Sequence, residues 1–283
     1  MALTKLSVNI NKVATLRNTR TLEIPSVVGL ARVALEAGAQ GITVHPRPDQ
    51  RHIRAYDVEN LAALWREFPG KEFNIEGNPL LEYMGHIRKV RPTQCTLVPD
   101  AREAFTSNHG WVLHGAEGER DAARLMPLIA EMKGLGCRVS LFMDGDSPDI
   151  ERARELGADR VELYTEPYAA AFASGDAGLL ARSLELYARG AARARAAGMG
   201  VNAGHDLNLL NLRVFLQGVK GVDEVSIGHA LIGDALEFGM GETVRRYLAA
   251  CGAGNQPRMH ADEDEGAGRD LTQRAPRARR PPR

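Results

Sequence analysis

The residues best suited to chemistry follow a short apolar run, Gly41–Val44, whose composition predicts a buried strand. His45, Arg47 and His52 come directly after this run, in a segment that also contains two prolines. An imidazole is suited to proton transfer near neutral pH, and a guanidinium group binds anionic groups through a rigid fork of N–H donors. Charged loops of this kind are also common on protein surfaces. The functional interpretation depends on the same pattern recurring after other strands.

Other strand-like runs end in the same way. Glu76 closes the run 72–76, and His205 follows the run 200–203. Further polar residues or glycines at strand ends are Asn9, Asn11, Asp100, Thr106, Gly204, Gly228 and His229. Burial at a barrel mouth raises the pKa of a glutamate towards that of an imidazole, which suits such a set to general acid/base catalysis. We therefore expect His45, Glu76 and His205 to share one site.

A metal site is the competing use of these residues. Barrel hydrolases usually carry a His-x-His pair on the first strand, where this chain has Asn9, Ile10 and Asn11. Glu76 is the one carboxylate expected beside His45 and His205. We therefore predict proton transfer and no catalytic metal.

Phosphate binding is the second chemical theme. The cations near the strand ends are Lys12, Arg17, Arg20 and Arg47. Gly204 and Gly228 occupy the positions where barrels commonly bind phosphate through backbone N–H groups, although glycine also serves simply as a turn residue. The pattern predicts a doubly anionic substrate or a pair of phosphate esters.

The elements that must position these residues alternate between strands and helices, which predicts a parallel sheet. The eight strand candidates are Leu6–Asn9, Gly41–Val44, Glu72–Glu76, Gln94–Val98, Arg138–Met143, Arg160–Thr165, Gly200–Ala203 and Glu224–Gly228. The amphipathic helices expected between them are Val27–Glu36, Val58–Glu67, Asp121–Lys133, Pro148–Leu156, Gly178–Ala197 and Leu207–Gln217. Eight strands predict a TIM (β/α)8 barrel.

Local signals support these helix boundaries. Ser147 and Asp57 are expected to cap the helices that begin at Pro148 and Val58. Four helices are expected to end in glycine, at Gly38, Gly136, Gly157 and Gly198. Seven residues after each glycine lies a position at or near a strand end. This recurring spacing is a weak internal repeat.

Composition excludes several classes of protein. The 283 residues carry a formal net charge of zero, with a pI near 7.1, so no overall charge favours nucleic acid or membrane surfaces. No apolar run would span a bilayer and no secretory signal is evident, so we expect a cytoplasmic protein. The three cysteines are widely spaced and predict neither a disulfide framework nor a zinc motif. Residues 1–251 are expected to form the barrel domain, followed by a disordered tail, 252–283.

With these residues identified, the chain resembles the pyridoxine 5'-phosphate synthase family from about Leu6 to Leu248. The motifs that carry the resemblance are VNINKVATLRN at 8–18, GITVHPR at 41–47, DQRHI at 49–53, NIEG at 74–77, LVP at 97–99, VNAGH at 201–205 and IGHA at 227–230. The resemblance implies a TIM barrel with additional helices, assembled as a homo-octamer, a tetramer of dimers. It also implies a transferase-type condensation of 1-deoxy-D-xylulose 5-phosphate with 3-amino-2-oxopropyl phosphate, which yields pyridoxine 5'-phosphate, phosphate and water without cofactor or metal.

The resemblance also implies roles for individual residues. His45 and Glu76 match the family's proton acceptors, and His205 matches its proton donor. The matches to its substrate contacts are Arg47, His52 and Thr106 for the deoxyxylulose phosphate, and Asn9, Arg20, Gly228 and His229 for the amino-ketone phosphate, with Asn11, Lys12 and Asp206 beside them. Arg20 is expected to reach a neighbouring subunit.

Three features depart from the family pattern. Asn11 and Lys12 stand where some members have Asp-His, and Asp206 stands where glycine is frequent. The tail beyond Gly252 has no counterpart. These departures leave the roles of Asn11, Lys12 and Asp206 open.

Two other functions remain as alternatives. Another barrel enzyme acting on a sugar phosphate, an aldolase or isomerase, would fit the same fold, and a Schiff-base aldolase would have only Lys12 as a candidate lysine. A catalytically idle barrel that senses phosphate metabolites would bind both substrates without releasing phosphate.

Overall fold

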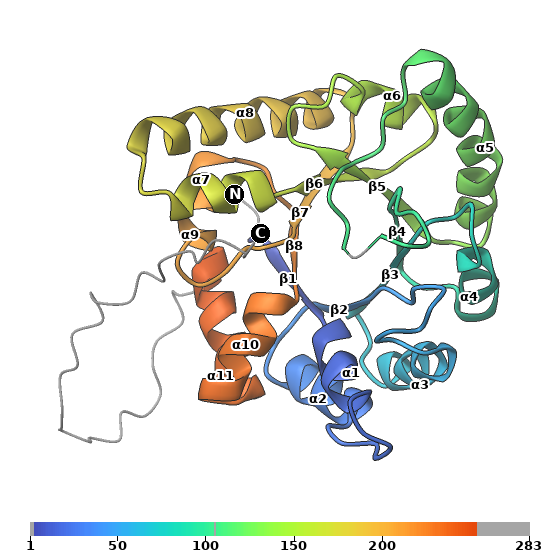
Figure 1. Ribbon diagram of the computed structural model, residues 1–283, viewed down its shortest axis with the longest axis vertical. Coiled ribbons are helices and arrows are strands. Elements are labelled where there is room, and N and C mark those ends of the chain that lie inside the picture. Colours follow the sequence, from blue (N-terminus) through green and yellow to red (C-terminus); the bar gives the residue numbers. More distant parts are fainter. Residues whose placement is uncertain (1–2, 105, 254–283) are drawn as a thin grey trace, which may run out of the picture.

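The computed structural model describes residues 3–104 and 106–253. Its parallel strands form a closed barrel in sequence order, with helices packed around the outside (Figure 1). The strands are β1 (Lys5–Asn9), β2 (Gly41–Val44), β3 (Glu72–Gly77), β4 (Gln94–Leu97), β5 (Arg138–Asp144), β6 (Arg160–Tyr164), β7 (Gly200–Gly204) and β8 (Glu224–Ile227). All the predicted strands are therefore confirmed to within one residue at either end, and so is the TIM barrel.

The helices are more numerous than the sequence pattern predicted. They are α1 (Asn11–Arg17), α2 (Val27–Glu36), α3 (Ala55–Arg66), α4 (Tyr83–Val90), α5 (Gly115–Gly134), α6 (Ile150–Glu155), α7 (Glu166–Ala173), α8 (Ala177–Ala196), α9 (Leu212–Gly218), α10 (His229–Phe238) and α11 (Met240–Leu248), followed by the π-helical turn η1 (Ala249–Ala253). Helices α1, α4, α7, α10 and α11 were not individually predicted. The start of α5 lies six residues before Asp121, and α9 starts five residues after Leu207.

Both predicted side-chain caps are wrong. Helix α3 begins at Ala55, so Asp57 lies inside its first turn, where its carboxylate accepts a hydrogen bond from the backbone N–H of Arg54 at 2.8 Å. Helix α6 begins at Ile150, and the hydroxyl of Ser147 accepts the backbone N–H of Asp149 at 3.1 Å. In both places the side-chain oxygen accepts a backbone N–H other than the one that the predicted cap would have accepted.

The four predicted glycine stops are confirmed. Gly38, Gly136, Gly157 and Gly198 have φ angles of 112°, 85°, 101° and 77°, values that side chains disfavour. Each glycine turns the chain from a helix into the next strand. These turns set where β2, β5, β6 and β7 begin.

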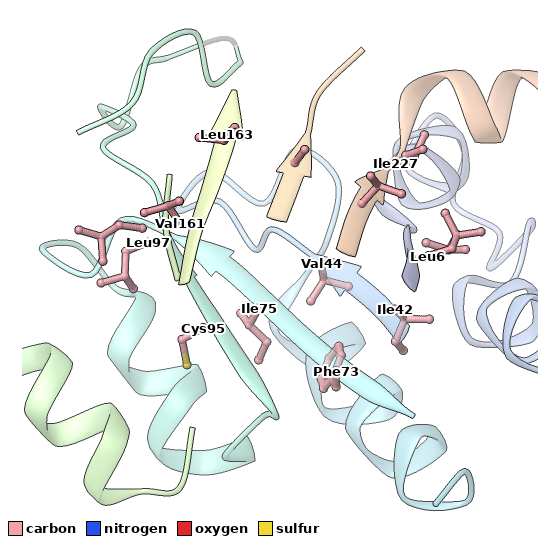
Figure 2. Packing of buried hydrophobic residues seen from close by; sticks show 14 of the residues in the cluster. Leu6, Ile42, Val44, Phe73, Ile75, Cys95, Leu97, Val161, Leu163 and Ile227 are labelled. Atoms are coloured by element: carbon pink, nitrogen blue, oxygen red, sulfur yellow. The ribbon is translucent and has the colours of Figure 1, made fainter. Parts of the chain in front are cut away.

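The hydrophobic core lies between the barrel and its helices. Alternate strand residues, such as Leu6, Ile42, Ile75 and Leu163, are fully buried and belong to one continuous apolar cluster (Figure 2). Because successive side chains of a strand point to opposite faces, the residues between them must point into the barrel.

The barrel interior is polar, unlike the Val, Ile and Leu layers that fill most TIM barrels. Hydrogen bonds cross it between strands that are not neighbours. Gln94 Nε2 on β4 donates to Glu224 Oε1 on β8 at 3.4 Å, and Thr96 Oγ1 donates to Glu162 Oε2 on β6 at 3.4 Å. Apolar packing therefore stabilises the outer face of the strands, and hydrogen bonds connect polar side chains across the inner face.

An ionic cluster occupies the amino-terminal end of the barrel. Lys5 Nζ lies 2.5 Å from Glu72 Oε1, and Arg138 pairs with the other carboxylate oxygen. Burial alone would raise the pKa of Glu72, but the hydrogen bonds from Arg138 and Lys5 lower it to about 2. Ion pairs therefore stabilise this end of the barrel, whereas the predicted functional residues lie at the carboxyl end.

Most of the predicted tail, 252–283, lies outside the described residues, so the domain boundary stays a prediction. Cys95, Cys137 and Cys251 are buried free thiols. Among the described helices, none has the length and apolar character needed to cross a membrane.

Candidate active site

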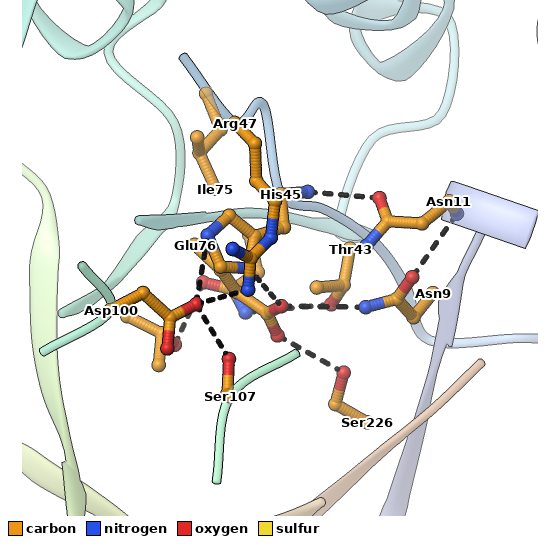
Figure 3. A network of polar contacts seen from close by, with 12 residues as sticks. Asn9, Asn11, Thr43, His45, Arg47, Ile75, Glu76, Asp100, Ser107 and Ser226 are labelled. Atoms are coloured by element: carbon orange, nitrogen blue, oxygen red, sulfur yellow. Dashed lines mark hydrogen bonds and ion pairs between the residues drawn. The ribbon is translucent and has the colours of Figure 1, made fainter. Parts of the chain in front are cut away.

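The predicted acid/base residues of β2 and β3 meet at the carboxyl end of the barrel (Figure 3). His45 follows β2, and Glu76 lies near the end of β3; the two residues are 7% and 9% exposed. His45 Nδ1 lies 3.9 Å from Glu76 Oε2. This separation is longer than a hydrogen bond, as is common before a substrate tightens a catalytic pair.

Glu76 is a buried carboxyl group held by neutral donors. Asn9 Nδ2 donates to Oε2 at 3.4 Å, and Ser226 Oγ donates to Oε1 at 3.5 Å. Burial, followed by the nearby carboxylates of Glu162 and Asp100, raises the pKa of Glu76 well above its usual value. Glu76 therefore holds a proton more readily than an ordinary glutamate, which suits it to donate a proton to a leaving group.

His45 has the opposite shift. Burial and the positive charge of Arg47 lower its pKa well below the usual value, so the imidazole is neutral and able to accept a proton. Two asparagines hold its backbone. Asn11 Oδ1 accepts the His45 N–H at 2.9 Å, and Asn9 Oδ1 accepts the Asn11 N–H at 3.1 Å. In this structure Asn9 and Asn11 therefore hold His45 and Glu76 in place.

His205 reaches the site from the end of β7. Its Nε2 lies 3.2 Å from Thr106 Oγ1, and its ring packs edge-on against Tyr164 with the centroids 5.1 Å apart. The residue next to Thr106, Ser107, donates to Asp100 Oδ2 at 2.8 Å. The segment that carries Thr106 and Ser107 therefore bridges His205 and the His45 side of the barrel mouth.

Arg47 is engaged by that same region of the chain. Its guanidinium group pairs with the Asp100 carboxylate and donates to the carbonyl oxygen of Ala104 at 2.7 Å. Burial lowers the pKa of Arg47, and the charge of Asp100 opposes that effect. Arg47 is thus a buried cation at the mouth of the barrel.

His52 is also buried and neutral. Its Nδ1 accepts the N–H of Ile53 at 2.9 Å, and burial, with the charge of Arg47, lowers its pKa to about 4. The carbonyl oxygen of His52 accepts from Asn18 Nδ2 at 2.8 Å. The free ring nitrogen, Nε2, is the one that remains for a ligand.

One predicted phosphate cation has a different role. Arg17 is buried and forms an ion pair with Asp57, with 2.5 Å between Nη1 and Oδ1. It was expected beside a phosphate because it follows the first strand, but α1 turns it away from the strand end and into this pair. Arg17 supports the segment that contains His52, to whose carbonyl oxygen it donates at 3.4 Å.

The ends of β7 and β8 form the more open part of the site. Lys12, Asp206 and His229 are exposed there. The pKa of Asp206 is lowered first by the adjacent imidazole of His205, whose Nδ1 lies 3.4 Å from Oδ2, and also by the charges of His229 and Lys12. Gly228 lies against Asn9 and precedes α10, whose first N–H groups have no partner within the helix. Arg20 is exposed on the loop after α1 and is not brought to these residues within one chain.

Sequence reasoning missed Glu162. Its side chain points into the barrel beneath the site, is 3% exposed and lies so close to β7 that a Cβ on Gly204 would be 2.5 Å from its Oε1. Burial and the charge of Glu224 raise its pKa to about 8. The available signal was its position between Val161 and Leu163, because strand alternation places a polar residue there on the inner face.

Groups of metal-ligating residues were also sought. Over residues 3–104 and 106–253, no cluster of three or more His, Cys, Asp or Glu side chains has the arrangement of a metal site. The chemistry available to the described side chains is proton transfer and anion binding.

Comparison with known proteins gives a consistent result. The model of the family described as "Pyridoxal phosphate biosynthesis protein PdxJ" matches residues 6–253. A protein from Albidiferax ferrireducens named pyridoxine 5'-phosphate synthase is 56% identical over 259 residues, which are 89% of this chain and 98% of the relative. A protein of the same name from Xanthomonas campestris pv. campestris is 55% identical over 258 residues, which are 89% of this chain and 97% of the relative.

Solved structures share the fold at low sequence identity. A tryptophan synthase structure from M. tuberculosis superimposes with a TM-score of 0.58 at 14% identity, covering 88% of this chain and 93% of that one. A protein from Aquifex aeolicus VF5 gives a TM-score of 0.55 at 14% identity, with the same coverage of the two chains. These likenesses show the barrel fold alone.

Proposed function

The chain belongs to the PdxJ family of pyridoxal phosphate biosynthesis proteins, and from this premise we propose how its site makes pyridoxine 5'-phosphate. Its activity is that of a pyridoxine 5'-phosphate synthase, a ring-forming enzyme of vitamin B6 biosynthesis. The substrates are 1-deoxy-D-xylulose 5-phosphate and 3-amino-2-oxopropyl phosphate, and the products are pyridoxine 5'-phosphate, phosphate and water. The observation that carries the proposal is the sequence identity of 55–56% over nearly the whole length of each relative.

The first step joins the two substrates. The amine of the amino-ketone attacks the ketone carbon of the deoxyxylulose phosphate, a C–N bond forms, and a hydroxyl group then leaves as water. Glu76 gives a proton to this hydroxyl, since its raised pKa favours the protonated form, and it then takes a proton back as the acceptor that the family resemblance implies. His45 accepts a proton released from nitrogen or carbon, because its lowered pKa keeps the imidazole neutral. Two groups with oppositely shifted pKa values thus share acid and base roles.

The later steps remove phosphate and close the ring. Elimination breaks the C–O bond to the phosphate of the deoxyxylulose partner, and the bond electrons leave with the phosphate. A water molecule then adds to the carbon that lost the phosphate, while the phosphate of the amino-ketone partner is retained as the 5'-phosphate of the product. His205, at the opposite side of the mouth, protonates a leaving oxygen. The deoxyxylulose carbon next to this position attacks the ketone carbon of the amino-ketone partner and forms the C–C bond that closes the ring. The oxygen of that ketone and the remaining hydroxyl group on the attacking carbon leave as water, which gives the aromatic pyridine. Each proton moves between a named side chain and a substrate atom, so the sequence requires no oxidant.

Substrate contacts follow from the position of the cations and helix ends. We assign Arg47, His52 and Thr106 to the deoxyxylulose phosphate. The amino-ketone phosphate is assigned to the β7 and β8 side, which includes Asn9, Gly228 and His229, with Asn11, Lys12 and Asp206 nearby. Arg20 is assigned to the same phosphate from a neighbouring subunit. The N-terminus of α10 supports this assignment, because its free N–H groups favour an anion.

The family resemblance extends the proposal beyond one chain. The enzyme is proposed to be a transferase-type cytoplasmic homo-octamer, a tetramer of dimers, that needs no cofactor. The exposed position of Arg20 is compatible with a contact to a neighbouring subunit's site.

The decisive experiment mixes both phosphates with the purified enzyme. We expect the absorbance of the pyridine ring to appear together with one equivalent of inorganic phosphate, and mass spectrometry to identify pyridoxine 5'-phosphate. Borohydride treatment with either substrate alone tests the aldolase alternative. A covalent adduct at Lys12 without pyridine formation would contradict the proposal.

A further inference from the structure

His45 lies between two carboxyl groups. Its Nδ1 is 3.9 Å from Glu76 Oε2, and its Nε2 is 3.8 Å from Asp100 Oδ2 (Figure 3). The three side chains are buried together at the barrel mouth. The proposed reaction assigns a role to Glu76 but none to Asp100, which follows β4.

Asp100 is held firmly from several directions. Its carboxylate forms an ion pair with Arg47 and accepts the hydroxyl of Ser107 at 2.8 Å. Its backbone carbonyl oxygen accepts Asn78 Nδ2 at 3.0 Å. A carboxylate in an ion pair accepts hydrogen bonds and has no proton to donate. The group that faces His45 Nε2 is therefore a fixed acceptor.

A neutral imidazole has one N–H and one lone pair, and the partner of one nitrogen decides which atom carries the proton. We propose that Asp100 is the positioning residue for His45. Its carboxylate lies 3.8 Å from Nε2, longer than a hydrogen bond, and its negative charge favours the proton on that nitrogen. The lone pair is then left on Nδ1, the nitrogen that faces Glu76 and the reacting atoms. This inference rests on the proposed role of His45 as a base. It adds the residue that determines which nitrogen acts.

The proton path follows from this tautomer. Nδ1 takes a proton from the substrate, and the ring becomes an imidazolium whose Nε2–H stays on nitrogen beside the Asp100 carboxylate. Glu76, having given its own proton to the departing hydroxyl, recovers one from Nδ1. The cycle therefore returns His45 to its neutral form and Glu76 to its protonated form, with Asp100 unchanged throughout.

A purely structural role for Asp100 predicts something different. If Asp100 served only to hold Arg47, its loss would weaken binding of the phosphate assigned to Arg47. KM for the deoxyxylulose phosphate would then rise while kcat stayed near its original value. A positioning role instead lowers kcat, because the imidazole presents the wrong nitrogen to the substrate.

The first test needs no substitution at Asp100. In the ligand-free enzyme labelled with 15N-histidine, the His45 resonances are assigned by their loss in His45→Gln. We expect the two nitrogen shifts to report the Nε2–H tautomer. The Nδ1–H tautomer in the native enzyme would overturn the proposal, whether or not the enzyme makes pyridoxine 5'-phosphate.

The second test is kinetic. Asp100→Asn keeps the shape but offers an amide donor to Nε2, so we expect kcat to fall by about 10²- to 10⁴-fold, with the Nδ1–H tautomer appearing in the spectrum. Asp100→Glu, which restores the carboxylate, should recover most of the kcat. Ser107→Ala is the matched control, because it removes another hydrogen bond to the same carboxylate, and we expect kcat within about fivefold of the native value. A change confined to KM in Asp100→Asn would overturn the inference while the native enzyme's product confirmed the proposed function.

Discussion

The hydroxyl of Thr165 donates a hydrogen bond to the backbone carbonyl oxygen of His205 at 2.5 Å, and so joins the end of β6 to the end of β7. The same hydroxyl lies 2.8 Å from the carbonyl oxygen of Gly204. His205 and Asp206 have φ angles of 84° and 58°, a conformation that is unfavourable for residues other than glycine. Thr165 is fully buried and holds this turn in place.

Thr165→Val should therefore misplace His205. Valine keeps the shape of threonine but donates no hydrogen bond, and small displacements of a catalytic group cost about 10- to 100-fold in rate. We expect kcat to fall by this amount, measured from phosphate release. Thr165→Ser, which retains the hydroxyl, should keep most of the activity. Equal loss in both variants would show that the methyl group, rather than the hydrogen bond, matters.

Glu76→Gln should leave a folded enzyme with little activity. The amide cannot donate the proton that the departing hydroxyl needs, so we expect kcat to fall by about 10²- to 10⁴-fold. The measurement is pyridine formation under saturating substrates, with circular dichroism to check the fold. Glu36→Gln, at an exposed carboxyl group in α2, is the control and should retain full activity. Near-native turnover in Glu76→Gln would remove this residue from the mechanism.

His52 should make the protein less stable in acid. Its pKa falls from 6.5 in the unfolded chain to about 4 in the fold, so the unfolded chain binds the proton more readily between these values. The contribution of His52 to the free energy of unfolding is fully present above pH 6.5 and is lost as the pH falls towards 4. The total loss is about 3 kcal/mol in the free energy of unfolding. Urea titrations at several pH values should show a weaker acid dependence in His52→Gln; an unchanged slope would contradict this account.

Glu162 should have the opposite effect. Its pKa rises from 4.5 to about 8, so the folded chain binds the proton more tightly than the unfolded chain does. This contribution is complete below pH 4.5 and is lost as the pH rises towards 8. Glu162→Gln, which cannot ionise, should flatten the pH dependence of the urea midpoint on the alkaline side. A slope identical to that of the native protein would show that Glu162 is already ionised at neutral pH.

Gly110→Ala should disturb the segment that carries Thr106 and Ser107. A Cβ at Gly110 would lie 2.4 Å from the backbone nitrogen of Asp144, so this segment could no longer pack against β5. We expect lower thermal stability and lower kcat. Gly85→Ala in α4 is the matched control, because its Cβ meets nothing within 4 Å, and alanine should stabilise that helix by about 0.5–1 kcal/mol. A native melting temperature in Gly110→Ala would refute the close packing.

The strands were predictable because local and tertiary requirements agree there. A glycine turn such as Gly38 precedes Gly41–Val44, and the buried strand itself leaves little choice of residue type. Helix starts were less predictable. Aspartate is a residue type that is favoured at helix N-caps, but Asp57 lies inside a helix that begins earlier. Its carboxylate there pairs with Arg17, which is distant in the sequence.

The site was predictable where side chains directly follow strands. His45 and Glu76 lie at the ends of β2 and β3, and the parallel pairing of these neighbouring strands brings the two side chains within 3.9 Å. Glu162 and Asp100 could not be placed in the same way. Strand alternation points Glu162 into the barrel, but its neighbours there depend on the register of β6. The partners of Asp100 depend on how the segment after β4 returns over the mouth.

Because side chains alternate along each strand, substitutions at neighbouring positions change different properties of the enzyme. A substitution on the outer face, such as one at Ile75, acts on how much folded enzyme a cell retains, because that residue packs in the apolar cluster. A substitution one position along, at Glu76, acts on what each folded molecule can do. Selection can therefore adjust abundance and chemistry through neighbouring codons, almost independently of each other.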